Sequence, residues 1–145
     1  MEQNSLISFA DVKANLFDPG ILTFLKPSVY DPTAERLKHR AEKYSADKNT
    51  FVYACKIDGV YVGIVVLKTE NGTAEILDIA VNPKYRKKGI GKSLIDFILN
   101  QFPVDTITAE TDNEAVEFYK RCEFDVIGFG MKRNNKRYIC RKLKF

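Results

Sequence analysis

The sequence is poor in the residues and segments that metal sites and membrane spans require. It contains one histidine, His39, and three cysteines that are far apart and form no C-x-x-C pair: Cys55, Cys122 and Cys140. This set of residues does not suit a structural zinc site, so we expect no metal. The longest purely apolar run, residues 60–67, is too short to cross a bilayer, so we expect no membrane partner.

Features of a secretory signal are also missing. Residues 1–5 have no basic start and no apolar stretch, and an odd number of widely spaced cysteines favours reduced thiols. We therefore expect a cytoplasmic protein. With 145 residues, of which 45% are apolar and 29% charged, and with no repeat or low-complexity stretch, the sequence predicts one globular domain over residues 1–145.

Acidic residues are absent from the C-terminal end of the chain. All 19 Asp and Glu residues precede residue 131, whereas residues 131–145 contain seven of the 23 Lys and Arg residues. Such a basic segment can contact nucleic acid or another polyanion. It also alternates with apolar residues such as Tyr138 and Leu143, which a free basic arm does not need. We favour a terminal strand with a solvated cationic face, and nucleic acid is the less favoured partner.

The first fifty residues divide into short, helix-leaning pieces. Prolines at positions 19, 27 and 32 interrupt them. Residues 33–44 are expected to form a helix, because apolar residues recur there at helical spacing and Thr33 or Asp31 can cap its start. These first fifty residues carry no motif that identifies a ligand.

Strands dominate from residue 51 onward. Asp58-Gly59 and Asn71-Gly72 are strong hairpin turns, and they predict an antiparallel meander of residues 51–57, 61–68 and 73–81. Asn82-Pro83 ends the third strand. The remaining elements are predicted as a helix over 89–101, a strand over 106–110, a helix over 113–122, and a hairpin of 125–132 and 137–145 around Asn134-Asn135. This order predicts a mixed α/β (α+β) sheet with helices on its faces.

Residues 86–93 (RKKGIGKS), between a predicted strand and a predicted helix, carry most of the chemical information. The start of a helix offers unpaired N–H groups and a partial positive charge. Gly89 and Gly91 remove the Cβ atoms that would keep a phosphate from the backbone, and the neighbouring lysines and arginine add positive charge. A ligand with a pyrophosphate suits this segment, and a solvated basic helix start is the alternative.

Two other phosphate motifs do not fit. A dinucleotide-binding GxGxxG motif needs a third glycine at position 94, which is leucine. A P-loop needs its first glycine at position 86, which is arginine, although Gly91-Lys92-Ser93 matches the end of that motif.

The pattern Arg86-x-x-Gly89-x-Gly91 after an apolar strand resembles the acyl-CoA-binding motif of the GNAT superfamily of N-acetyltransferases. Residues 112–124 (DNEAVEFYKRCEF) are similar to a second block of that family, N-x-x-A-x-x-[FL]-Y-x-x-x-G-F. The resemblance covers roughly residues 51–145. It implies a mostly antiparallel central sheet of six to seven strands with helices on both faces, acetyl-CoA as the cosubstrate, and transfer of the acetyl group to an amine.

The resemblance also implies roles for residues that match the family motifs. At the end of the third meander strand, Ile79, Ala80 and Val81 would meet the pantetheine and the thioester, and an N–H near Val81 would be the oxyanion donor. The pyrophosphate would be held by the loop and helix start, that is by Arg86, Lys87, Lys88, Gly89, Ile90, Gly91, Lys92 and Ser93.

Tyr119 matches the family tyrosine that protonates the departing thiolate, and its alternative role is that of a core aromatic. Two positions depart from the family pattern. Asp112 replaces the usual asparagine that contacts the cofactor, and Asn113 could substitute for it. Glu123 replaces a glycine, and in a left-handed helix cap this change costs on the order of 1 kcal/mol.

A general base is needed because an amine acceptor is mostly protonated at pH 7. Glu75 holds the position of a general-base glutamate in part of the family, and Asp78 is the second candidate; a base that acts through water, or none, is the third possibility. Strict alternation predicts Glu75, Ile79 and Val81 on one face and Asp78 on the other. A bulge, which the resemblance implies, would break that parity. An acyl-cysteine on Cys122 or Cys140 is disfavoured because no histidine lies nearby in sequence.

The resemblance implies that the acceptor is a primary amine on a small molecule or a peptide. We expect the N-terminal pieces, residues 22–30 and 34–44, to bind it, with Phe24, Tyr30 and Tyr44 as candidate lining residues. A homodimer is compatible with the sequence. Two alternative functions stay open: a non-catalytic acyl-CoA-binding module, and a polyanion-binding protein that uses the basic C-terminal hairpin.

Overall fold

The computed structural model describes residues 7–144, and within them seven strands form one sheet in the order β1-β2-β3-β4-β5-β7-β6. The strands are β1 (Ile7–Asp11), β2 (Thr50–Ile57), β3 (Val60–Glu70), β4 (Thr73–Val81), β5 (Thr106–Thr111), β6 (Asp125–Lys132) and β7 (Asn135–Leu143). The helices are α1 (Pro19–Leu22), α2 (Ala34–Ala46), α3 (Ile90–Gln101) and α4 (Val116–Arg121), with short 3-10 helices at Lys13–Asn15, Thr23–Ser28 and Pro83–Tyr85. The predicted mixed α/β sheet with helices on both faces is confirmed.

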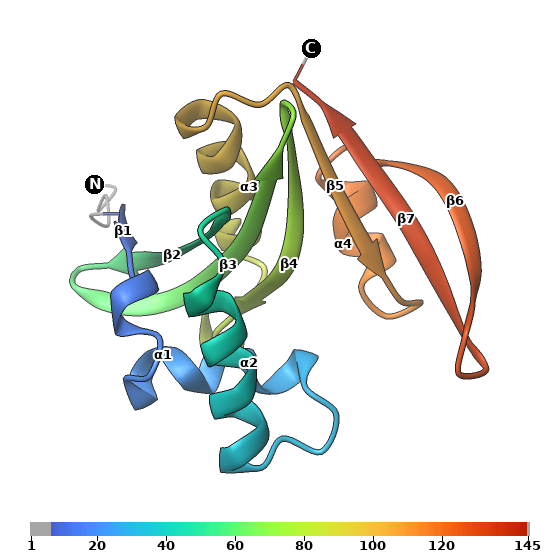
Figure 1. Cartoon of the computed structure of the whole chain (residues 1–145). Coiled ribbons are helices and arrows are strands. Elements are labelled where there is room, and N and C mark those ends of the chain that lie inside the picture. The colour runs from blue at the N-terminus through green and yellow to red at the C-terminus, as the bar shows by residue number, and fades with distance from the viewer. Residues whose placement is uncertain (1–6, 145) are drawn as a thin grey trace.

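The helices divide the core into two layers, one on each face of the sheet (Figure 1). On one face, α1 and α2 pack with apolar residues of β2 and β3 such as Val52 and Ile64. On the other face, α3 and α4 pack with residues such as Val65, Ile76 and Ile107. None of the helices in residues 7–144 is both long and apolar enough to span a membrane.

The two Gly-containing turns close the meander as predicted. Asp58 and Gly59 have φ values of 49° and 83°, and Asn71 and Gly72 have values of 50° and 79°. Positive φ at both central residues is the type I′ geometry, whose twist matches that of the flanking strands. β2, β3 and β4 are therefore joined as consecutive antiparallel neighbours.

The arrangement of β4 and β5 positions the candidate site. These strands are the parallel pair of the sheet, and their pairing runs only from Thr73↔Thr106 to Ile76↔Ala109. Beyond Ile76, β4 pairs with β3 alone, while β5 continues beside β7. The two strands diverge toward their C-terminal ends (Figure 1), and one edge of β4 is left without a neighbouring strand.

A bulge in β4 changes which side chains share a face. Ile76 lies opposite Leu67, and Asp78 lies opposite Val66, so Leu77 is an extra residue in β4. As a result Ile76 and Ile79 both pack toward α3 and α4, which strict alternation forbids. Asp78 lies on the face opposite Ile79 and Val81, as predicted, but Glu75 does not share the face of Ile79 and Val81, because its neighbours Ala74 and Ile76 do.

Three local expectations differ from the structure. The first fifty residues were expected to be helix-leaning, but they contain the strand β1, whose five residues pair with β2. α4 begins at Val116 and not at residue 113, because the residues before it form a turn capped by Asp112. The last hairpin turns at Arg133-Asn134, with φ values of 51° and 67°, and not at Asn134-Asn135. The basic C-terminal segment otherwise forms the predicted strand.

Candidate active site

The loop between β4 and α3 is shaped by one side-chain cap and two left-handed residues. The Asn82 side chain accepts the N–H of Lys84 at 3.0 Å, which fixes the short 3-10 helix after β4. Lys87 and Gly89 then adopt φ values of 62° and 78°. Gly89 caps α3 in a conformation that costs a residue with a Cβ about 1–2 kcal/mol, so the backbone favours glycine at this position.

Six consecutive backbone donors are free at this loop. In the described part of the chain, no backbone or side-chain acceptor is bonded to the N–H groups of residues 87–92, and intrahelical bonding begins when Ser93 donates to Gly89 at 2.9 Å. Free N–H groups at the start of a helix bind anions well. Exposed Arg86, Lys87 and Lys88 surround them, whereas Lys92 is bonded to Asp96 at 2.9 Å.

Gly91 has a packing role that the sequence does not reveal. It is buried, and a Cβ at this position would lie 2.6 Å from the Cε1 atom of Phe118 on α4. The missing side chain therefore lets α4 approach the first turn of α3. Gly91 thus lets the loop between β4 and α3 pack against α4, the helix that carries Tyr119. It also leaves the backbone N–H groups of the loop accessible.

The unpaired edge of β4 presents further backbone donors. The N–H of Asn82 donates to Val62 on β3 at 2.8 Å. Because alternate residues of an antiparallel strand face the same neighbour, Ala80 also faces β3, whereas the N–H groups of Ile79 and Val81 point toward the space that β5 has left. The N–H of Val81 thus has the direction that the predicted oxyanion donor needs.

Tyr119 lies on α4 between two aromatic rings. Its ring is 5.1 Å from those of Phe118 and Phe124, and the residue is 5% exposed. No described residue is hydrogen-bonded to its hydroxyl, although every fully buried side-chain oxygen in residues 7–144 has a partner. The hydroxyl therefore reaches accessible space. Burial, with smaller contributions from Cys140 and Asp78, raises the pKa of Tyr119 above its usual value, so the phenol is protonated at neutral pH.

The two polar residues before α4 are engaged within the protein. The Asp112 carboxylate accepts the N–H groups of Glu114 and Ala115, each at 3.0 Å. The Asn113 side-chain oxygen accepts the hydroxyl of Tyr138 on β7 at 2.5 Å. The contacts of Asp112 and Asn113 with acetyl-CoA stay predictions. Within the protein, Asp112 caps the turn before α4 and Asn113 connects this turn to β7. Glu123 has a φ of 68°, so it adopts the left-handed conformation in which a residue other than glycine is strained.

Asp78 is the centre of a buried polar cluster on the α2 face of β4. It is 7% exposed and accepts a short hydrogen bond from the Tyr44 hydroxyl of α2. Arg40 lies 3.5 Å from the same carboxylate and also bonds Ser28 at 3.2 Å. Burial raises the pKa of Asp78 despite these partners, and burial beside Asp78 raises the pKa of Tyr44 as well.

Glu75 lies in a different environment. It is exposed, and it sits opposite Lys68 on β3 and Thr108 on β5, within the paired part of the two parallel strands. Asp78 lies beyond that part, where β4 has no neighbour on one edge. The two candidate bases thus differ in burial and in their distance along β4 from Val81.

The cysteines are not prepared for nucleophilic chemistry. Cys55, Cys122 and Cys140 are all buried as free thiols, and burial raises the pKa of each. A raised pKa leaves less of the reactive thiolate at neutral pH.

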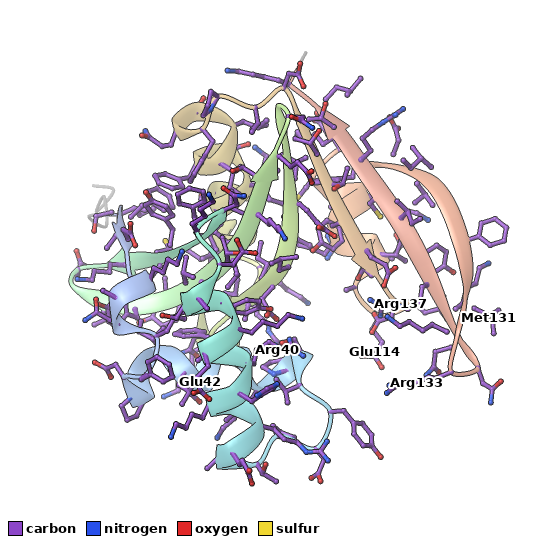
Figure 2. The ribbon with its side chains drawn as sticks, in the orientation of Figure 1. Arg40, Glu42, Glu114, Met131, Arg133 and Arg137 are labelled. Carbon is purple, nitrogen blue, oxygen red and sulfur yellow. The ribbon has the colours of Figure 1, made fainter. Side chains whose placement is uncertain are left out.

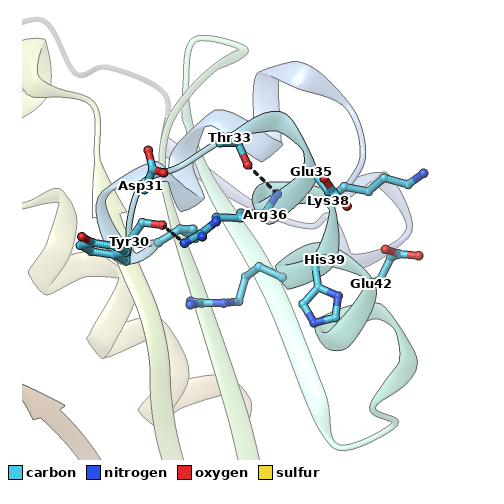
Figure 3. A pocket seen from close by; sticks show the side chains of 10 residues that line it. Tyr30, Asp31, Thr33, Glu35, Arg36, Lys38, His39 and Glu42 are labelled. Atoms are coloured by element: carbon cyan, nitrogen blue, oxygen red, sulfur yellow. Dashed lines mark hydrogen bonds between the residues drawn. The ribbon is translucent and has the colours of Figure 1, made fainter.

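An open surface hollow of about 780 Å³ lies beside this cluster (Figure 3). It is lined by residues between Val29 and Glu42, including the predicted Tyr30. Arg36 shapes its rim by donating to the backbone oxygen of Tyr30 at 3.1 Å, and Arg40 joins it to Asp78. Tyr44 and Phe24 do not line it: Tyr44 is buried against Asp78, and Phe24 packs on the core.

Sequence reasoning missed most of the buried cluster around Asp78. Asp78 was recognisable as a carboxylate in a strand, but nothing near Arg40 or Tyr44 in the sequence indicates that they meet it. The signal available was a polar residue inside an otherwise apolar strand, which needs partners when it is buried. The contact between Gly91 and Phe118 left no sequence signal of its own.

Comparison with known proteins finds similarity to acetyltransferases. The sequence matches the acetyltransferase (GNAT) family over residues 20–124. An uncharacterized N-acetyltransferase from Bacillus methanolicus, in the lysA 3′ region, is 29% identical over 105 residues, which cover 72% of this chain and 83% of that protein. An aminoglycoside 6′-N-acetyltransferase complexed with coenzyme A has a TM-score of 0.79 at 16% identity, covering 97% of both chains. A Bacillus anthracis (strain Ames) structure, named for streptothricin acetylation and solved with acetyl coenzyme A, is 28% identical with a TM-score of 0.61, covering 70% of this chain and 67% of that one.

Proposed function

Because the chain belongs to the acetyltransferase (GNAT) family, we propose that it transfers the acetyl group of acetyl-CoA directly to a primary amine within a ternary complex. It is an acetyltransferase with acetyl-CoA as its cosubstrate. The acceptor class, the site residues and a cytoplasmic location belong to the proposal. The acceptor is a small molecule or a peptide amine, because the open hollow beside Arg40 leaves room for either.

One observation carries the proposal: two sets of free backbone donors lie next to each other in the chain. The N–H groups of residues 87–92 are free at the start of α3, and those of Ile79 and Val81 point away from β3 where β5 diverges. The first set suits a pyrophosphate, and the second suits the amide groups and thioester of a pantetheine arm. The residues present therefore fit acetyl-CoA.

The chemistry follows from these groups. The acceptor nitrogen attacks the thioester carbonyl, and the Val81 N–H donates to the oxygen on which negative charge develops. The carbon–sulfur bond then breaks, and Tyr119 donates its proton to the departing sulfur. The raised pKa of Tyr119 keeps that proton in place at neutral pH. Tyr119 regains a proton from solvent, and the acceptor nitrogen loses one to a base.

Two carboxylates remain candidates for that base. Glu75 is exposed, whereas Asp78 is buried, lies nearer to Val81 in the chain and has a raised pKa that makes it a better proton acceptor than an ordinary aspartate. A base that acts through water, or no base, is the third possibility, and it is favoured if neither Glu75→Gln nor Asp78→Asn changes the acidic limb of kcat/KM. If Glu75→Gln abolishes the acidic limb of kcat/KM and Asp78→Asn does not, Glu75 is the base, and the reverse result assigns Asp78.

Release of free CoA thiol across a panel of amines, polyamines and peptide N-termini tests the proposed function. Acetyl-CoA-dependent release with at least one amine, together with saturable acetyl-CoA binding by calorimetry, is the expected result. Binding without turnover on any amine would instead favour the non-catalytic acyl-CoA-binding module. Absence of binding would overturn both functions. If turnover is intact after the cysteine thiols are alkylated, an acyl-cysteine route is excluded.

A further inference from the structure

Two arginine side chains of α2 are held in place at the hollow of Figure 3. Arg36 and Arg40 are one helical turn apart, so they lie on the same flank of α2. Arg36 donates to the backbone oxygen of Tyr30 at 3.1 Å. Arg40 donates to the hydroxyl of Ser28 at 3.2 Å and to its backbone oxygen at 3.5 Å. Both guanidinium groups are therefore fixed against the segment that leads into α2.

Arg36 in particular keeps N–H donors free. A guanidinium group has five N–H donors. The bond to Tyr30 uses one donor of Arg36, and within residues 7–144 no carboxylate forms an ion pair with this exposed side chain. Arg40 bonds through its two terminal nitrogens, and Asp78 is its carboxylate partner in the described chain. Arg36 is thus a fixed positive charge with donors left for a ligand.

The acidic residues of the hollow do not neutralise Arg36. Glu35 and Glu42 are seven residues apart and share a different flank of α2, and Figure 3 shows Glu42 pointing away from Arg36. Asp31 is exposed at the rim and pairs with no cation in the part of the chain that the structure describes. The flank with the two arginines therefore faces one paired acid, the buried Asp78, and has an excess of positive charge.

We propose that the acceptor is an amine that also carries a carboxylate, and that Arg36 and Arg40 bind this carboxylate. The proposal rests on acetyl transfer to an amine and names the class of that amine. The planar guanidinium group matches the two oxygens of a carboxylate in a bidentate contact. A purely cationic amine, such as a polyamine, would instead be repelled by the two arginines.

The position of the two arginines suits this role. Arg40 contacts Asp78 of β4, three residues before Val81. A carboxylate bound on this flank of α2 would thus hold the acceptor beside the strand whose end carries the proposed oxyanion donor. The Tyr30 ring, 81% exposed and 6.0 Å from the Cζ atom of Arg36, offers apolar surface next to the charge. An amino acid with an aromatic or aliphatic side chain therefore suits the site.

Steady-state kinetics on matched pairs of amines test the proposal. Phenylalanine and lysine are compared with phenethylamine and cadaverine, which are the same molecules without the carboxylate. Arg36→Gln should lower kcat/KM for the two amino acids at least about tenfold, mainly by raising KM, because it removes a charged hydrogen bond. It should leave kcat/KM for the other two amines nearly unchanged. Comparing the variant with the wild type on each amine cancels the differences in amine pKa.

Two further variants serve as controls. Lys48→Gln removes the same charge at an exposed site outside the hollow and should change kcat/KM for neither kind of amine. Arg36→Lys keeps the charge but loses the planar group, so it should recover only part of the loss. Thermal unfolding shows that each variant is folded.

The failure of this proposal can be told apart from the failure of acetyl transfer. If Arg36→Gln affects both kinds of amine equally or neither, or if only amines without a carboxylate are acetylated, the carboxylate site is overturned and acetyl transfer stands. If no amine is acetylated, the proposed function fails, and calorimetry with N-acetylphenylalanine tests the carboxylate site by itself. Binding that Arg36→Gln weakens about tenfold would support the site. Absence of binding, or binding that the variant leaves unchanged, would overturn it.

Discussion

The two sides of β4 are built in different ways. On the side of α3 and α4, the candidate site consists of backbone N–H groups fixed by left-handed residues and a buried glycine. On the side of α2, it consists of side chains, with Asp78 bonded to Tyr44 and paired with Arg40. Figure 2 shows Arg40 on α2, with Arg137 of β7 and Glu114, from the turn before α4, across from it.

This difference decides what each side can recognise. Backbone donors are the same in any sequence that adopts the loop, so they suit a cosubstrate shared by a whole family. Side chains between residues 29 and 42 can change without altering that loop, so they suit an acceptor that differs between relatives. The predictions below test this division, beginning with the largest expected effect.

Tyr119→Phe should lower kcat about 100-fold, because it removes the proton donor to the leaving thiolate. Acetyl-CoA affinity should change little, since the phosphates are bound by the backbone of residues 87–92 and not by this hydroxyl. Steady-state kinetics and calorimetry measure the two quantities separately. Tyr138→Phe, which removes a hydroxyl bonded to Asn113, is the matched control and should leave kcat nearly unchanged. Unaltered turnover of the Tyr119 variant would remove Tyr119 from the chemistry.

Gly91→Ala should destabilise the protein by about 1–3 kcal/mol and weaken acetyl-CoA binding, because the new Cβ overlaps the Phe118 ring. Urea unfolding measures the free energy of unfolding. Adding Phe118→Leu should recover part of that loss. Gly128→Ala, whose Cβ would meet Ile139 at an ordinary 3.7 Å, is the matched control. If the two alanine variants behave alike, the contact between Gly91 and Phe118 does not position α4.

Asp78→Asn should change how stability depends on pH. Burial raises the pKa of Asp78 in the folded state, so between the unfolded pKa, about 3.9, and the folded pKa the folded protein binds more protons. The free energy of unfolding therefore falls as pH rises through this window. Asparagine does not titrate. The difference in the free energy of unfolding between the wild type and the variant should therefore fall from pH 4 toward neutrality. If this difference grew with pH, burial would not disfavour the charged form of Asp78, and the account of Asp78 would be contradicted.

Glu123→Gly should give the smallest effect, a stabilisation of about 1 kcal/mol, because glycine adopts the φ of 68° without strain. Unfolding in urea measures it. Glu117→Gly, inside α4, should instead destabilise the protein by about 0.5–1 kcal/mol. A destabilised Glu123 variant would mean that the glutamate makes a compensating contact.

Most of the candidate site between β4 and α3 could be predicted, because its features depend on residues that are close in sequence. Asp58-Gly59 and Asn71-Gly72 specify their turns by backbone geometry, and the glycines of residues 86–93 mark a helix start where N–H groups stay free. The left-handed cap at Glu123 was also visible, as a departure from a short pattern. Each of these depends on neighbours within a few residues.

The missed features depend on contacts between distant residues. β1 is a strand because five residues meet β2, and Asp78 can be buried because Tyr44 and Arg40 reach it from α2. Gly91 contacts a phenylalanine 27 positions later. The bulge at Leu77, which decides the face of Asp78, is a matter of pairing with β3. No local pattern specifies such contacts, whose partners are set by the fold.

The direct test of the free backbone donors is amide NMR spectroscopy of the ¹⁵N-labelled protein during titration with acetyl-CoA. The largest shifts are expected at the N–H groups of residues 87–92 and at Val81, and inorganic pyrophosphate should shift residues 87–92 but not Val81. Saturable binding that leaves residues 87–92 unshifted, with the large changes elsewhere, would contradict the account.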